Sequence, residues 1–326
     1  MDITFQQLAV NGITLRVAIK EPSSGGPRPP LVVLIHGWPE SWYAWRHQIP
    51  VIADAGFRVA APDLRGYGGS DCPEAVEEYS MVRMTDDVAQ LVEALGHDHA
   101  ILVGHDWGAP IAWVSAIRFP MMIRAVAGLS VPHLRRAHTD IRSLYEKLYR
   151  DRFFYMLHFQ QEGLAEAELE ADVESSLRKI YYAASGDCEE SDRGFSATAP
   201  KSGLLEGLVD PDPFPEWLSR QDLDYLVSQY RQSGFRGGLN RYRNFERDWR
   251  ELPELSESVI EQPALFIAGD RDPVLDYIPG KRLHEEMDEM YANLRGKYIF
   301  EGIGHWVQQE APAATNELLL QFLREL

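Results

Sequence analysis

Gly104-His105-Asp106-Trp107-Gly108 is the stretch of sequence that decides the fold. The apolar run Ala100 to Val103 precedes it, and a helix-like stretch, Ala109 to Arg118, follows it. A strand, a sharp turn and a helix in this order are the context of the G-x-S-x-G nucleophile elbow, which presents its central residue at the end of a buried strand. The sequence therefore predicts an α/β sheet whose elbow carries an aspartate, Asp106, in place of the usual serine.

The exchange of serine for Asp106 changes which bonds the elbow can break. An alkoxide that attacks a saturated carbon leaves an ether, which water does not readily reverse. A carboxylate that attacks the same carbon leaves an ester, and an ester can be hydrolysed. The structural alternative is an aspartate that caps a helix, but the elbow glycines and the preceding strand argue against it. The motif therefore favours displacement at an sp³ carbon over esterase chemistry.

The rest of the chain predicts a mostly parallel, doubly wound sheet with a helical insertion. Short apolar runs separated by helical stretches are typical of buried parallel strands. These runs are Leu31–Ile35, Phe57–Ala61, Ile101–Val103, Ala125–Leu129, Ala264–Ala268 and Lys297–Phe300. Between about residues 134 and 255 the chain is rich in helix formers, aromatic residues and charges, and this pattern is missing. We therefore expect a core formed by residues 1–133 and 256–326, with a helical cap at 134–255.

Composition limits the partners that the chain can have. The 326 residues are 45% hydrophobic and 25% charged, as in an ordinary globular protein. A formal charge of −18 would repel nucleic acid and anionic membrane surfaces, so we expect neither as a partner. No apolar run is long enough for a membrane span, and no signal-peptide pattern follows Met1. The acidic stretch Glu162 to Glu174 is expected to be a solvated helix face.

Cysteine usage points to a reducing compartment and to no metal site. Cys72 and Cys188 are the only cysteines, and their separation gives neither a disulfide framework nor a zinc signature. His97-Asp98-His99 lies between a predicted helix and a predicted strand, where a solvated turn explains it better than a metal site. We therefore expect a cytoplasmic protein that needs no metal ion or other cofactor.

Three further motifs follow predicted strands, at the edge where open α/β sheets bind their ligands. They are His36-Gly37-Trp38-Pro39-Glu40-Ser41, Ala268-Gly269-Asp270-Arg271-Asp272-Pro273 and Gly304-His305-Trp306. With the elbow, they place a nucleophile, an acid and a histidine along the chain in the order of the hydrolase elbow topology. Both Asp270 and Asp272 compete for the place of the acid.

The chain resembles the soluble, lid-bearing epoxide hydrolases of the α/β-hydrolase superfamily. The segments that carry the resemblance are His36–Ser41, Asp63–Ser70, Gly104–Pro110, Phe153–Glu170, Ser233–Trp249 and Gly304–Glu310. They lie in both the core and the insertion, so the resemblance covers nearly the whole chain. It implies an α/β-hydrolase fold with an inserted cap, a small apolar epoxide and water as substrates, no cofactor, and a monomer or homodimer.

The resemblance also implies a role for each residue of a catalytic triad. Asp106 is the nucleophile, and His305 activates the water that attacks the resulting ester. Asp272 orients the imidazole and stabilises its charged form. The family pattern favours Asp272, which precedes a proline, over Asp270.

Two tyrosines of the predicted cap complete the site that the resemblance implies. Tyr155 and Tyr242 supply the proton that the epoxide oxygen needs as the ring opens, because a phenol near pKa 10 is protonated at neutral pH. Packing is the structural alternative, since the chain has 14 tyrosines. The backbone amides of Trp38 and Trp107 form the oxyanion hole, and a cis Trp38–Pro39 bond is expected. The pocket is lined by Trp38, Pro39, Trp107 and Trp306.

Two classes of protein compete with this interpretation. A haloalkane dehalogenase also has an elbow aspartate, but such enzymes carry asparagine where this chain has Trp38, and fluoroacetate dehalogenases carry arginine where it has Trp107. A receptor or scaffold that has lost turnover would not need the set of Asp106, His305 and Asp272. The sequence therefore favours an enzyme that opens epoxides.

Overall fold

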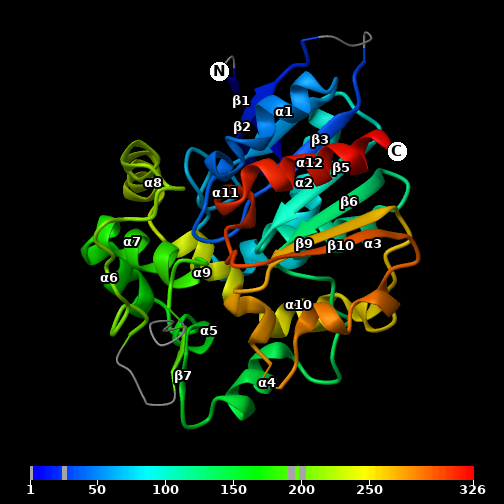
Figure 1. The fold of residues 1–326 in the computed structure, drawn as a ribbon. Helices are drawn as coiled ribbons and strands as arrows, with labels where there is room; N and C mark the ends of the chain where they lie inside the picture. Colours follow the sequence, from blue (N-terminus) through cyan, green and yellow to red (C-terminus); the bar gives the residue numbers. More distant parts are fainter. Residues whose placement is uncertain (1–2, 24–27, 190–194, 198–202, 279) are drawn as a thin grey trace.

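The structure is a computed structural model that describes residues 3–23, 28–189, 195–197, 203–278 and 280–326. An eight-stranded sheet in the order β1-β2-β4-β3-β5-β6-β9-β10 forms its centre (Figure 1). The strands are β1 (Thr4–Val10), β2 (Ile13–Lys20), β3 (Leu31–Ile35), β4 (Arg58–Pro62), β5 (Ala100–His105), β6 (Ile123–Leu129), β9 (Ala264–Gly269) and β10 (Leu294–Phe300). β2 pairs antiparallel with β1 and β4, and the other neighbours are parallel. The predicted mostly parallel sheet is confirmed.

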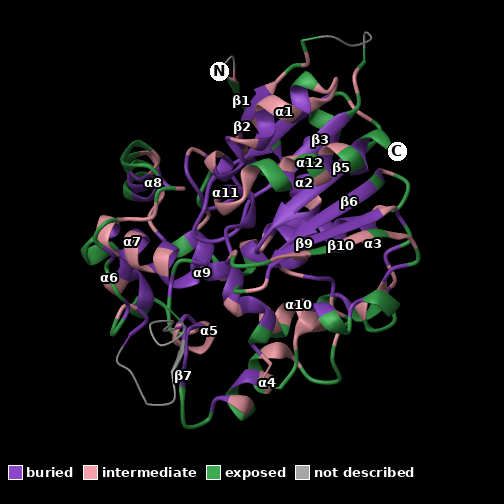
Figure 2. Ribbon diagram, viewed as in Figure 1, coloured by how far each residue is buried: buried purple, intermediate pink, exposed green. Residues whose placement is uncertain are grey.

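Helices cover both faces of the sheet because its strands send apolar side chains alternately to each side. The covering helices are α1 (Gln48–Asp54), α2 (Met81–Ala94), α3 (Gly108–Arg118), α11 (Val307–Glu310) and α12 (Pro312–Arg324). Along β3, Val32 and Leu34 belong to the apolar cluster that includes α1 and α12, whereas Val33 and Ile35 belong to the cluster that includes α2 and α3. Figure 2 shows the central strands as a continuous buried layer. The purely apolar strand sequences are thus explained by burial on both faces.

The chain between β6 and β9 is mainly helical and gathers at one end of the sheet, coloured green to yellow in Figure 1. Its helices are α4 (Ile141–Leu148), α5 (Tyr155–His158), α6 (Leu164–Ala171), α7 (Val173–Ala184), α8 (Arg220–Ser233), α9 (Arg236–Tyr242) and α10 (Phe245–Glu251). A short ladder pairs β7 (Phe153–Phe154) with β8 (Ser196–Ala197). None of the helices in the described ranges combines the length and the apolar character that a membrane crossing requires.

The acidic stretch Glu162 to Glu174 is only in part the solvated face that we predicted: Glu162, Glu170 and Asp172 are exposed, but other members make specific contacts. Glu166 is buried, and its carboxylate lies 2.6 Å from the guanidinium of Arg243, just after α9. The carboxylate of Glu170 accepts a hydrogen bond from the backbone amide of Phe235 at 3.0 Å. The prediction fails for Glu166, and the contacts of Glu166 and Glu170 attach α6 to the segment around α9, an arrangement that charge content alone does not show.

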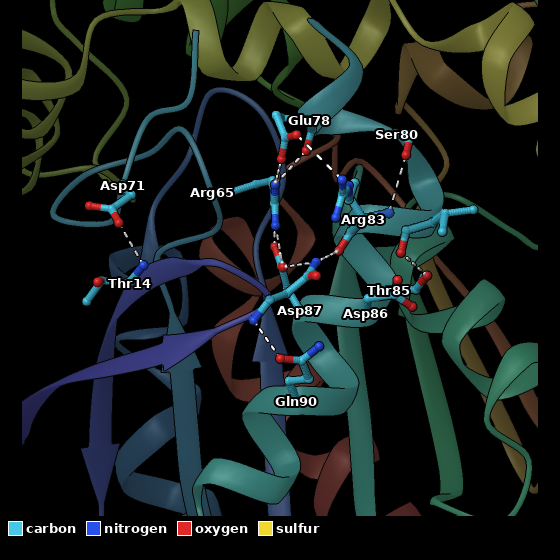
Figure 3. A network of polar contacts seen from close by, with 12 residues as sticks. Thr14, Arg65, Asp71, Glu78, Ser80, Arg83, Thr85, Asp86, Asp87 and Gln90 are labelled. Atoms are coloured by element: carbon cyan, nitrogen blue, oxygen red, sulfur yellow. Dashed lines mark hydrogen bonds and ion pairs between the residues drawn. The ribbon is translucent and has the colours of Figure 1, made fainter. Parts of the chain in front are cut away.

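Helix α9 is attached to the core through the turn that precedes α2. The buried guanidinium of Arg241 donates a hydrogen bond to the backbone carbonyl of Tyr79 in that turn. Below the turn, the buried Arg65 donates to both carboxylate oxygens of Asp87 on α2 at 2.5 Å each. Arg65 also donates to the carbonyl of Glu78 at 2.7 Å (Figure 3). These hydrogen bonds hold in place the turn before α2, against which α9 packs.

Candidate active site

Asp106 occupies a strained turn between β5 and α3. Its φ of +50° lies in the left-handed region, which is unfavourable for a residue other than glycine. A Cβ atom on Gly104 would lie 2.0 Å from the carbonyl oxygen of Gly108, and one on Gly108 would lie 1.9 Å from that of Ile35. The two elbow glycines are therefore required for the close approach of β3, β5 and α3, which holds the Asp106 carboxylate at the strand end.

His305 lies between two carboxylates. Its Nε2 atom is 3.4 Å from Oδ2 of Asp106, and its Nδ1 atom is 3.0 Å from each carboxylate oxygen of Asp272. All three side chains are buried. Asp270 instead accepts a hydrogen bond from the amide of Gly302 at 2.8 Å. The geometry therefore brings together Asp106, His305 and Asp272, and it leaves Asp270 outside this group.

The two carboxylates determine the charge of the imidazole. Burial alone would lower the pKa of His305, but Asp272 and Asp106 outweigh it and hold that pKa well above its ordinary value. Burial likewise opposes ionisation of Asp106, but His305 and the amide of Trp38 hold its pKa below the usual range. The resting site is thus an imidazolium between two carboxylates. In the described part of the chain, no group of three or more His, Cys, Asp or Glu side chains is placed to hold a metal ion.

The amide of Trp38 points at the carboxylate of Asp106. It donates a hydrogen bond to Oδ1 at 2.7 Å. The Trp38–Pro39 peptide is cis, so that prediction is confirmed. Trp107 follows Asp106 at the start of α3, and its indole ring lies edge-on to Tyr242 with 5.1 Å between ring centroids. The role of the Trp107 backbone amide as a donor in the oxyanion hole stays a prediction.

Two phenols from the helical segment face the cavity that contains Asp106. Tyr155 begins α5, Tyr242 ends α9, and their ring centroids are 5.9 Å apart. Both are buried, and burial together with the negative charge of Asp106 raises the pKa of each well above 10. Both phenols are therefore protonated at neutral pH.

A third phenol, which the sequence did not reveal, lies in the same cavity. The ring centroid of Tyr277 is 5.7 Å from that of Tyr155, and Tyr277 lines the space beside Asp106 together with Tyr155 and Tyr242. Tyr277 comes from the core, in the turn after Asp272. No motif marks it among the other tyrosines, so only the folded chain shows it.

Two chambers meet at Asp106, Tyr155 and Tyr242. The larger has a volume of about 230 Å³ and extends between α3, α4 and α10. The smaller has a volume of about 20 Å³ and is bordered by His305 and α7. Asp106, Tyr155 and Tyr242 therefore lie where the larger, mostly apolar chamber meets the smaller one.

The predicted pocket residues are divided between these chambers. Trp107 lines the larger chamber, and Trp38 and Trp306 line the smaller one. Pro39 does not line either of these two chambers, and its place in the substrate pocket stays a prediction. The hydroxyl of Tyr181 on α7 donates a hydrogen bond to the Pro39 carbonyl at 3.1 Å.

A buried polar network lies behind the site. Nε2 of His105 is 2.8 Å from the carbonyl oxygen of His305, and Nδ1 of His105 is 2.7 Å from the carboxylate of Glu40. Glu40 also accepts a hydrogen bond from the amide of Gly37 at 2.9 Å. Glu40 and His105 stand in motifs that the sequence singled out, but their side chains had no predicted role. Their contacts fix the backbone on both sides of the reacting groups.

Glu310 holds the loop that carries His305 in place through hydrogen bonds to backbone amides. Its carboxylate accepts hydrogen bonds from the amides of Gly304 and Trp306 at 3.0 Å each, the two residues that flank the histidine. It also accepts one at 2.8 Å from the amide of Gly186, at the end of the turn after α7. Burial raises the pKa of Glu310 to about 7 despite these three donors. The carboxylate therefore connects the histidine loop with the helical segment.

Comparisons with known proteins show the family to which the chain belongs. A family model for the alpha/beta hydrolase fold matches residues 30–312. Epoxide hydrolase A of Mycobacterium tuberculosis is 40% identical over 316 residues, covering 97% of this chain and 96% of that protein. The crystal structure of Epoxide Hydrolase A from Mycobacterium thermoresistibile has a TM-score of 0.91 at 40% identity, covering 99% of this chain and 98% of that one. An epoxide hydrolase from an endophytic Streptomyces has a TM-score of 0.92 at 38% identity, covering 99% and 95%. The chain belongs to the epoxide hydrolases of the α/β-hydrolase fold.

Proposed function

We propose that the protein hydrolyses epoxides to vicinal diols through a covalent ester on Asp106. The observation that carries this proposal is the placement of His305 between Asp106 and Asp272, beside a cavity that two protonated tyrosines share. The relatives named as epoxide hydrolases support it. A dehalogenase would need donors for a halide, whereas paired phenols suit an oxygen that leaves as an alkoxide.

In the first step, a carboxylate oxygen of Asp106 attacks one epoxide carbon, and the bond from that carbon to the ring oxygen breaks. The hydroxyl groups of Tyr155 and Tyr242 hold the oxygen, and one of them gives it a proton. The transfer is favourable because an alkoxide is a much stronger base than a phenolate. The product of this step is a hydroxyalkyl ester of Asp106 and one phenolate.

Ester formation prepares the second step by removing the negative charge of Asp106. One of the two carboxylates that raise the pKa of His305 is then lost, so the imidazolium gives up its proton, which restores the phenol. The neutral imidazole can now act as a base toward water, with Asp272 still at its Nδ1 atom. The loss of the negative charge on Asp106 thus converts His305 from a cation into a general base.

In the second step, water loses a proton to His305 and attacks the ester carbonyl of Asp106. The amide of Trp38, which already points at Asp106, stabilises the oxyanion together with the amide of Trp107. One such donor is typically worth about 3 kcal/mol. The intermediate then collapses, the diol oxygen takes a proton from the imidazolium, and the diol leaves. The carboxylic acid so formed on Asp106 gives its proton to His305, which restores the resting carboxylate and imidazolium.

The helical segment would act as a lid on this reaction. We propose residues 134–255 as the cap and residues 1–133 with 256–326 as the core, because Tyr155 and Tyr242 come from the former and the triad from the latter. Closing the lid removes bulk water, which strengthens the electrostatic interactions inside the site.

A single turnover in heavy-oxygen water tests the covalent route. With enzyme in excess over epoxide, the oxygen added to the first diol should come from Asp106 and be unlabelled, while the label enters the Asp106 carboxylate. Peptide mass spectrometry locates the label, and Asp106→Asn serves as the control without a nucleophile. Label that appears directly in the first diol would exclude the ester.

A further inference from the structure

The larger chamber is walled mainly by apolar side chains, and His133 lies among them. His133 belongs to the chain that leaves β6, and β6 pairs with β5, the strand that ends beside Asp106. The imidazole is buried and lines the chamber from the same edge of the sheet as the nucleophile. It has no part in the reaction proposed above, so its chemistry is open to another use.

The contacts of Ser258 determine which nitrogen of His133 carries the proton. Nε2 of His133 lies 2.9 Å from Oγ of Ser258, and the same hydroxyl lies 3.0 Å from the carbonyl oxygen of Leu255. A carbonyl only accepts, and a hydroxyl has a single proton to donate. Both hydrogen bonds form only if Ser258 donates to Leu255 and the imidazole donates from Nε2. The other tautomer would lose one of these two bonds, so the proton belongs on Nε2.

Nδ1 of His133 is then an acceptor. None of the hydrogen bonds among the described residues reaches this atom, and the backbone amide of His133 donates elsewhere, to the hydroxyl of Tyr291 at 2.7 Å. Burial, with the nearby charge of Arg135, lowers the pKa of the ring to about 4, so Nδ1 keeps its lone pair near pH 7. A buried acceptor without a donor is unfavourable. A ligand that brings a donor would remove this cost.

The other polar groups in the chamber wall are paired or can donate. Asp248 accepts hydrogen bonds from the amide of Met81 at 2.7 Å and from a buried guanidinium. The indole of Trp113 donates to a backbone carbonyl at 3.0 Å. Phenols such as that of Tyr145 both donate and accept. Apart from the reacting carboxylate, His133 is thus the lining side chain, among those described, whose free polar atom can only accept.

We propose that the larger chamber binds epoxides whose apolar body carries a neutral hydroxyl group, and that this group donates to Nδ1 of His133. The epoxide ring lies at Asp106 and the two phenols, and the hydroxyl lies at the histidine, so the substrate is held at both ends. A charged donor is disfavoured, because burial of an unpaired charge is costly. This inference rests on the function proposed above, and it names the substrate class.

Matched pairs of 1,2-epoxyalkanes test the contact with the wild-type protein. In each pair the far end of the chain carries either a hydroxyl group or fluorine, which is similar in size and cannot donate. The ratio of kcat/KM for the hydroxyl compound to that for the fluoro compound should pass through a maximum as the chain lengthens, because the acceptor lies at a fixed place. A ratio that does not vary with chain length would overturn the inference. If none of these epoxides, nor styrene oxide, gives a diol, the proposed function itself fails.

His133→Phe should lower this ratio at the best chain length by about tenfold, the upper range for one neutral hydrogen bond. The two compounds are compared with the same variant, so a general loss of activity cancels from the ratio. Tyr145→Phe is the matched control, because it removes a different hydroxyl from the same chamber and should leave the ratio within about twofold. A fall in Tyr145→Phe without one in His133→Phe would place the donor elsewhere and overturn the inference. If His133→Phe fails to fold, the wild-type series still decides.

The tautomer of His133 can be observed without any substrate. Long-range ¹H–¹⁵N spectra of protein labelled at the histidine nitrogens distinguish a protonated ring nitrogen from a bare one, and His133→Asn assigns the signals by their loss. At pH 7, Nδ1 should be bare and Nε2 protonated. A proton on Nδ1 would overturn the inference and leave the proposed hydrolysis of epoxides untouched.

Discussion

At the scale of single residues, the site depends on how many carboxylates surround one imidazole. With Asp106 ionised, His305 has two carboxylate neighbours within 3.4 Å and is held as an imidazolium. With Asp106 esterified, only Asp272 remains. In the proposed mechanism, the same residue is therefore a cation before ring opening and a base after it.

His305→Gln should separate the two halves of the reaction. In the proposed mechanism, ring opening uses Asp106 and the tyrosines, so the ester should still form, but its hydrolysis loses the general base. Removal of such a base typically costs about 10²–10⁴-fold. Intact-protein mass spectrometry should show protein plus one epoxide, and His133→Gln should show none. Normal turnover by His305→Gln would refute the role of the histidine.

Replacement of Tyr155 and Tyr242 together by phenylalanine should slow ester formation by about 10²–10⁴-fold, the usual contribution of acid catalysis. Binding of a neutral urea that mimics the product should weaken much less. Stopped-flow measurement of the first turnover gives the rate, and Tyr145→Phe is the matched control, since Tyr145 is also buried beside the larger chamber. If the rate of ester formation and the affinity for the urea fell equally, the two tyrosines would have a packing role and no role in proton donation.

His133 should make the fold sensitive to acid. Its ring is buried, its Nε2 atom is 2.9 Å from the hydroxyl of Ser258, and burial lowers its pKa from 6.5 to about 4. Because the folded pKa is depressed, the contribution to stability is complete above pH 6.5 and is lost as the pH falls through about 4. At about 1.4 kcal/mol per pH unit, the loss is roughly 3 kcal/mol. Urea unfolding between pH 7 and 4 should show it, and His133→Asn should flatten this part of the profile.

At the scale of elements, the strands were predictable and the loop contacts were not. Leu31–Ile35 forms β3 with unchanged bounds, and the other apolar runs overlap their strands within a few residues, because burial on both faces leaves an uninterrupted apolar signal. The elbow was predictable because Gly104 and Gly108 stand where neighbouring backbone segments come too close for a Cβ atom, and only glycine fits there. Tyr277 and Glu310 were not assigned, since their importance comes from segments that are distant in sequence.

Glu310→Gln should disturb the loop that carries His305. An amide can replace the carboxylate at one end only, so at least one of the amides of Gly304, Trp306 and Gly186 would face another donor. A catalytic group misplaced by 1 Å can cost about 100-fold, so ester hydrolysis should slow by at least about tenfold. Ring opening, which in the proposed mechanism uses the tyrosines, should slow less. Rapid-quench kinetics measure both steps, and an equal effect on the two would contradict a positioning role.

At the scale of the whole molecule, the insertion leaves the sheet intact because it connects two neighbouring strands. β6 and β9 are hydrogen-bonded partners, and the helical segment leaves after the first and returns at the second. The site forms where this segment meets the core. Its geometry therefore depends on the contacts that hold α9 against the turn before α2, including those of Arg65 and Asp87 (Figure 3).

Asp87→Ala should be among the more destabilising changes in the core. It would leave the buried guanidinium of Arg65 without its main partner and would remove the acceptor, at 2.8 Å, of the side-chain amide of Asn11 in the β1–β2 turn. Breaking a buried pair in this way costs about 3–5 kcal/mol. The adjacent Asp86 gives a matched control, because its ion pair with Arg118 is partly exposed and should be worth no more than about 1 kcal/mol. Urea unfolding of both variants measures the difference, and equal losses would show that the Arg65 network does not stabilise the turn on which α9 lies.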